Sequence, residues 1–163
     1  MQLKEKLHLT YCTNIHPGQD WKSTFESIQK HVPDIKKDVS KDSAFGLGLR
    51  LSNKASEELE QGTNMADFKT WLSDNNLYVF TMNGFPYGNF HDERVKDMVH
   101  APDWTTNDRL IYTIRLFRQL SELLPKGLNG GISTSPITYK YWHKTEEEVK
   151  KAFEVGAKHM LQV

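Results

Sequence analysis

The sequence predicts an α/β fold built around a parallel β-sheet. Strand-like and helix-like segments alternate four times along the 163 residues, and strands separated by helical crossovers pair in parallel with right-handed connections. Polar side chains also gather just after each predicted strand, at the end of a parallel sheet where binding sites are built. The length suits one domain, and we expect residues 1–163 to form it.

The first βα unit is predicted over residues 7–32. The run LHLTYC, Leu7–Cys12, holds β-compatible residues and ends at the turn signal NIHPG. Asp20 can cap the next helix, whose apolar residues recur at steps of four, three and four: Trp21, Phe25, Ile28 and Val32. The intervening TNIHPGQDW has one glycine and matches neither the dinucleotide fingerprint nor the P-loop of nucleotide-binding open sheets.

The second and third strands are predicted at AFGLGLRLS, Ala44–Ser52, and at LYVFTMNGF, residues 77–85. The first of these alternates large apolar residues with small ones and one arginine, as in a strand between packed layers. Helical patterning lies between them in KASEELEQG and MADFKTWLSDNN, and the second helix has one apolar face: Met65, Phe68, Trp71 and Leu72.

The C-terminal third holds two predicted helices and a short strand. TTNDRLIYTIRLFRQLSELLP has the strongest helical pattern and ends at Pro125, with one apolar stripe: Leu110, Ile114, Phe117, Leu120 and Leu124. A short fourth strand is predicted around Ile132. TEEEVKKAFEVGAKHML is predicted as the last helix, in which Thr145 and Glu148 form a capping-box pattern.

Composition argues against several classes of partner. Twenty-one basic and 21 acidic residues cancel, so no overall field draws the chain to nucleic acid or to an anionic membrane. No segment approaches the roughly 18 apolar residues of a membrane span, and the N-terminus has no signal-peptide core. The single Cys12 cannot form an intramolecular disulfide or a thiolate metal cluster. We expect a cytoplasmic protein.

The candidate site residues follow the predicted strands. Because carboxyl ends of parallel strands converge, we expect them to line one pocket for a small polar metabolite: Asn14, His16, Arg50, Asn83, Tyr87, Asn89, His91 and Ser133.

Each of these residues also has a structural interpretation. His91 is either a loop histidine bonded to backbone or a ligand, metal or proton-transfer group, and His16 can be a turn residue. Arg50 needs an anionic partner, in the pocket or in a structural ion pair. Asn83 and Asn89 can supply turn chemistry, and Tyr87 can be lid packing. Farther along, VHAPDWT reads as a loop anchor: His100, Asp103 and a buried Trp104.

Four segments of the sequence resemble a known protein family. LTYCTNIHPGQDW, AFGLGLRLS, LYVFTMNGFPYGNFHDERVKDMVHAPDWTTNDRLIYT and GISTSPITYK resemble, in order, segments of the EboE-type metabolite traffic proteins, of the xylose-isomerase-like barrel superfamily. NGFPYGNFH, K-x-x-V-x-x-PDW and TYCTNIHPG are specific in combination. The resemblance implies a (β/α)8 TIM-type barrel, a divalent metal as a possible cofactor, and a link to secondary-metabolite traffic or maturation. The wider superfamily includes sugar isomerases, epimerases and an apurinic-site endonuclease.

The chain is shorter than the barrel that this resemblance implies. A complete barrel takes about 250 residues and eight strands, whereas four βα units are predicted here, so we expect the N-terminal half of such a barrel. Metal-binding carboxylates and histidines of the superfamily typically come from later strands. A half-barrel leaves its first and fourth strands unpaired and exposes inward residues such as Phe45 and Val79. We therefore expect a homodimer, or a separate chain that supplies the second half.

Two functional hypotheses follow. In the first, the chain is half of an isomerase-like barrel enzyme: His91 serves as metal ligand or proton-transfer group, and Arg50 holds an anionic or hydroxylated part of the substrate. In the second, the chain is a non-catalytic scaffold or an inactive remnant whose loops bind a metabolite or a protein. The lack of convergent acidic residues in the first four loops favours the second hypothesis. Neutral charge and the absence of a basic stripe argue against nucleic-acid repair.

Overall fold

The described chain forms one parallel sheet. The computed structural model describes residues 1–3, 7–88 and 96–163. Within these residues four strands pair in the order β1-β2-β3-β4, every neighbouring pair parallel. The predicted α/β fold with consecutive parallel strands is confirmed. The strands are β1 (Thr10–Cys12), β2 (Phe45–Arg50), β3 (Leu77–Asn83) and β4 (Gly131–Ser133).

Helices connect the strands, as the alternating pattern predicts. The α-helices are α1 (Trp21–Val39), α2 (Asn53–Leu59), α3 (Asn64–Asp74), α4 (Asn107–Leu123) and α5 (Glu146–Met160), and the short 3-10 helices are η1 (Thr13–Ile15), η2 (Lys96–His100) and η3 (Lys140–Trp142). Asp20 and Thr145 close capping boxes at the starts of α1 and α5. None of the helices in the described ranges is long and apolar enough to cross a membrane.

The hydrophobic core lies against one face of the sheet. Phe45, Leu47 and Leu49 of β2 are at most 2% exposed and cluster with Val79 of β3 and with side chains of α1 to α4. The expectation that Phe45 and Val79 would be exposed to solvent is therefore wrong. The alternation of β2 places them on the helix-covered face, because successive side chains of a strand point to opposite faces.

The opposite face, called the open face here, carries small and aromatic residues. Gly46 and Gly48 of β2 belong to it, and ring atoms of Tyr78 and Phe80 come within about 3.2 Å of the position a Cβ at Gly46 would take: Phe80 Cε1 at 3.1 Å and Tyr78 Cζ at 3.2 Å. A larger side chain at position 46 would crowd both rings and the carbonyl oxygen of Leu9, which lies 3.0 Å from the same position.

A β-bulge in β3 sets which residues reach the end of the open face. Leu47 pairs with Val79, but Gly48 pairs with Thr81, so Phe80 is an extra residue in the ladder. The shift returns Met82 to the core, where it is 2% exposed, and leaves Asn83 on the open face beside Arg50. Without the extra residue the alternation would bury the position of Asn83 instead.

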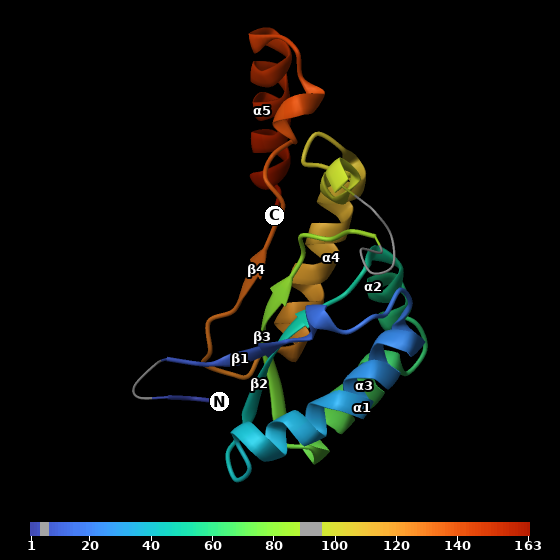
Figure 1. The fold of residues 1–163 in the computed structure, drawn as a ribbon, viewed down its shortest axis with the longest axis vertical. Coiled ribbons are helices and arrows are strands. Elements are labelled where there is room, and N and C mark those ends of the chain that lie inside the picture. Colours follow the sequence, from blue (N-terminus) through green and yellow to red (C-terminus); the bar gives the residue numbers. More distant parts are fainter. Residues whose placement is uncertain (4–6, 89–95) are drawn as a thin grey trace.

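Helix α5 does not pack against the sheet. Figure 1 shows it as a red helix beyond the strand ends, next to the beginning of α4. Its Gly156 abuts Ile137, whose Cγ2 would lie 2.6 Å from an added Cβ, and a hydrogen bond of 2.8 Å joins His159 Nδ1 to the carbonyl of Trp104. Because α5 does not cover the sheet, two of the three residues of β4 are exposed.

Candidate functional site

The carboxyl ends of β2, β3 and β4 meet in register. Arg50 pairs with Asn83, and Asn83 pairs with Ser133, so three sequence-predicted site residues are cross-strand neighbours. Asn83 Oδ1 accepts a hydrogen bond of 3.2 Å from Ser133 Oγ and one of 3.1 Å from the backbone N–H of Phe85. We call this group of Arg50, Asn83 and Ser133 the carboxyl edge.

Arg50 joins two loops at this edge. Arg50 is buried, with 3% of the residue's surface exposed. Nη1 donates to the carbonyl of Gly18 at 3.0 Å and Nη2 to the carbonyl of Gly88 at 2.5 Å, while its backbone N–H donates to Thr13 Oγ1 at 2.9 Å. Burial lowers the pKa of Arg50, yet a guanidinium keeps its charge in proteins. Its described side-chain partners are thus backbone carbonyls of the loops after β1 and β3.

A second buried arginine, Arg109 of α4, was not identified from the sequence. It is fully buried and donates to the carbonyls of Pro102, Gly84 and Phe85 at 2.8, 2.7 and 3.1 Å. Burial lowers its pKa. Arg109 thereby fixes the backbone immediately after Asn83. The sequence signal that could have identified it is an arginine at the start of the otherwise largely apolar buried face of α4.

Tyr87, a predicted substrate contact, packs on this second arginine. Its ring meets the Tyr112 ring edge-on at 5.1 Å, and the Arg109 guanidinium lies 5.8 Å from its centroid. Tyr112 is fully buried and donates from Oη to the carbonyl of Leu51 at 2.6 Å. Burial raises the pKa of Tyr112 to about 12. Tyr87 therefore contributes to packing under the loop, with its ring turned toward α4.

His16 also turns away from the open face. Its Nε2 lies 2.7 Å from Tyr11 Oη, and its ring stacks on that of His31 of α1 at 4.4 Å and 5°. His16 and Arg50 share a cavity of about 10 Å³, which is room for roughly one water molecule. The cavity is far too small for a metabolite.

The remaining predicted residues are placed as follows. Asn14 is half-buried in η1. Asn89 and His91 lie outside the described residues. Within residues 1–3, 7–88 and 96–163 no three His, Cys, Asp or Glu side chains lie close enough to hold a metal ion.

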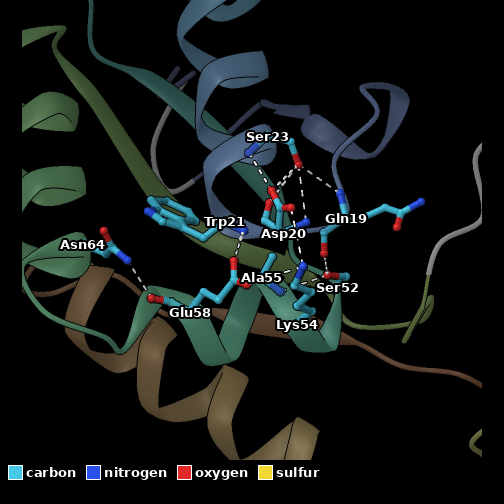
Figure 2. Close-up of polar contacts among 9 residues, drawn as sticks. All are labelled: Gln19, Asp20, Trp21, Ser23, Ser52, Lys54, Ala55, Glu58 and Asn64. Carbon is cyan, nitrogen blue, oxygen red and sulfur yellow. Dashed lines mark hydrogen bonds and ion pairs between the residues drawn. The ribbon is translucent and has the colours of Figure 1, made fainter.

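The loop after β1 is held on α2 by a polar network (Figure 2). Asp20 accepts from the backbone N–H of Ser23 at 2.8 Å, and Ser52 Oγ donates to the carbonyl of Gln19 at 2.5 Å. Glu58 of α2 accepts from the backbone N–H of Trp21 at 2.8 Å. Ser52 is at the same time the N-cap of α2, because its Oγ accepts from the Ala55 N–H. The network fixes the entry to α1 against the helix that follows the next strand.

An aromatic rim stands next to the carboxyl edge. The His100 ring stacks on Tyr139 at 4.8 Å, and the Phe85 ring lies 5.4 Å away. His100 Nδ1 is buried without a hydrogen-bond partner among the described residues. Trp104 is buried, and its Nε1 donates to Thr134 Oγ1 at 2.9 Å, which confirms the predicted burial of this residue.

Comparison of the chain with protein-family models, with curated proteins and with solved structures gives no match.

Removing the Arg109 guanidinium should destabilise the fold. We expect Arg109→Met to lower the free energy of unfolding by roughly 3 kcal/mol, because it leaves the buried carbonyl of Gly84 and the partly buried carbonyls of Pro102 and Phe85 without their donor, and a buried carbonyl without a donor costs about 1–3 kcal/mol. Arg118→Met on the same helix is the matched control: Arg118 is 62% exposed, with a 3.7 Å ion pair to Glu60, and should change stability by about 0.5 kcal/mol or less. Urea unfolding followed by circular dichroism measures both, and equal effects would contradict the anchoring role.

Asp20 should make stability depend on pH. Hydrogen bonds from Ser23 lower the pKa of Asp20 below its ordinary value of 3.8. The charged form is therefore favoured in the folded state, and its stabilisation is complete above that value and lost as pH falls through the lowered pKa. We expect the difference in unfolding free energy between wild type and Asp20→Asn to shrink on acidification.

Asparagine is a good N-cap that carries no charge, so Asp20→Asn isolates the titration, whereas Asp20→Ala should cost about 1 kcal/mol through loss of the cap. Urea midpoints measured in steps from about pH 5 to about pH 2 test the trend. A difference between wild type and Asp20→Asn that stays constant over this range refutes it.

Proposed function

We propose that the chain binds a small, hydroxylated metabolite at the carboxyl edge. The observation that supports this proposal is the Asn83–Ser133 pair: two neutral polar side chains on adjacent strands, 3.2 Å apart, with Ser133 exposed to solvent. Asn83 Oδ1 is used in holding Ser133 and Phe85, and its amide N–H groups donate to no other described residue. Amide and hydroxyl groups at the strand ends of a parallel sheet suit the hydroxyl groups of a sugar.

The nature of the edge supports a neutral or weakly anionic ligand. Arg50 lies in the same register as Asn83 but is buried and donates to loop carbonyls, so it contributes positive potential more than direct contact. The aromatic rim beside the edge, with Phe85, His100 and Tyr139, offers flat apolar surface next to polar groups. Ligand sites commonly combine such surfaces with a few placed polar groups.

Saturation-transfer NMR with free aldopentoses, aldohexoses and their phosphates tests this proposal. We expect at least one probe to saturate, and Asn83→Ala and Ser133→Ala each to weaken it by about tenfold, the loss of roughly 1.4 kcal/mol for a hydrogen bond. Asn129→Ala and Ser121→Ala are matched controls at exposed positions before β4 and on α4. Failure of every probe to saturate, or equal weakening by the control substitutions, rejects the proposal.

A manganese titration distinguishes the isomerase-like hypothesis, in which the chain is part of an enzyme, from the scaffold hypothesis, in which it only binds a ligand. On the isomerase-like hypothesis, His91 ligates a divalent metal or transfers a proton, and saturable Mn²⁺ binding measured by calorimetry should vanish in His91→Ala. On the scaffold hypothesis, wild type and variant show no saturable heat.

We also propose that the sheet associates with a second copy of the chain or with a chain that supplies further strands. The core forms on one face only, and β1 and β4 are three-residue edge strands. Parallel sheets usually have both faces covered. Static light scattering should give twice the chain mass of 18.9 kDa for the purified protein. A monomer at all concentrations up to about 100 μM, far above the roughly 1 μM constant of a modest complex, excludes self-association.

A further inference from the structure

A hollow of about 690 Å³ lies at the other end of the sheet, where the strands begin. It is bordered by Ser43 and Ala44 just before β2, by Tyr78 at the start of β3, and by Pro125 and Leu128 before β4. Its volume falls within the approximately 300–1,000 Å³ of small-molecule sites. We call it the amino-end hollow.

The N-terminal segment closes one side of this hollow. Residues 1–3 pair back on residues 7–9: Leu9 N–H donates to the carbonyl of Met1 at 2.8 Å and Leu3 N–H to the carbonyl of Leu7 at 2.7 Å. Gln2 and His8 form an isolated antiparallel bridge. This pairing brings Gln2, Leu3 and His8 to the lining.

Two rings with polar atoms form the specific part of the wall. His8 Nδ1 lies 2.9 Å from Tyr78 Oη, and the rings meet edge-on at 5.8 Å. Phe80 stacks behind Tyr78 at 5.7 Å and also touches His8 at 5.2 Å. Phe80 and the backbone at Gly46 thus pack closely against the Tyr78 ring.

The chemistry of the lining selects the charge of a ligand. Among the residues that the structure describes, the eight that line the hollow include no Asp, Glu, Lys or Arg: Gln2, Leu3, His8, Ser43, Ala44, Tyr78, Pro125 and Leu128. An ion entering this hollow would lose hydration without gaining a partner of opposite charge from these eight residues. His8 Nε2 has no hydrogen bond to a described residue, and in either neutral tautomer it offers one donor or one acceptor.

We propose that the amino-end hollow is a binding site for an uncharged aromatic molecule that carries one hydrogen-bonding group, which pairs with His8 Nε2. The aromatic ring of the ligand packs between Tyr78 and the aliphatic side chains of Leu3, Pro125 and Leu128. The site is separate from the carboxyl edge, since the two lie at opposite ends of β3.

The proposal is tested by NMR titration of the isotope-labelled full chain with phenol. Benzoate and benzylammonium serve as probes of similar shape with negative and positive charge. We expect saturable phenol-induced shifts of the His8 and Tyr78 ring signals, and binding of both charged probes at least about tenfold weaker, a difference of roughly 1.4 kcal/mol. Charged probes that bind as well as phenol, or shifts that spread over the whole surface, overturn the proposal.

Filling the hollow gives the second arm of the test. Ala44→Trp should abolish saturable phenol binding, and Leu128→Trp should do the same from another wall if the first variant does not fold. Ala66→Trp, an equal enlargement at an exposed alanine of α3, should leave phenol binding unchanged. Phenol binding that survives in a folded Ala44→Trp or Leu128→Trp variant shows that the ligand lies elsewhere and rejects the site.

Discussion

Two buried guanidinium groups determine the shape of the carboxyl edge. Loop backbone at the strand ends has no ladder partner, so its buried carbonyls need donors from elsewhere. Arg50 from β2 and Arg109 from α4 supply them, with two and three hydrogen bonds to five carbonyls. The planar guanidinium can serve several carbonyls in fixed directions, which an ammonium cannot do. The loop after β3 thus takes its conformation from both arginines together.

The polar residues that follow the strands fall into two groups: those that contact other parts of the protein, and those that can contact a ligand. Arg50, His16 and Tyr87 are engaged with carbonyls, Tyr11 and Tyr112 respectively. Asn83 is half-buried and its register partner Ser133 is exposed. The bulge at Phe80 places Asn83 on the open face by shifting the end of β3 by one residue. The metabolite site that we propose is therefore narrower than the set of residues that follow the strands.

The sequence was informative where periodicity was strong and uninformative where polar residues were buried. All four strands, the cap at Asp20 and the final helix were predictable from pattern. The buried face of α4 was not, since Phe117 is 40% exposed while Thr113 and Gln119 are buried. Their side chains bond to the carbonyls of Arg109 and Ser56, and hydropathy cannot anticipate such bonds. The bulge and the position of α5 likewise depend on tertiary contacts that no local pattern encodes.

The two ends of the sheet differ in charged side chains, because the backbone at each end finds its hydrogen-bond partners in a different way. Arginines are needed where irregular loops bury carbonyls, which is the carboxyl edge. At the amino end, residues 1–3 pair with residues 7–9, and the described residues that line the hollow beside them carry no charged side chain. From Tyr78 to Asn83 the strand spans about 17 Å at 3.3 Å per residue, roughly twice the Debye length at physiological salt. A solvent-exposed charge at the carboxyl edge is largely screened at this distance, and the ligand that we propose for the amino-end hollow is uncharged, so occupancy of one end should not alter affinity at the other through electrostatics.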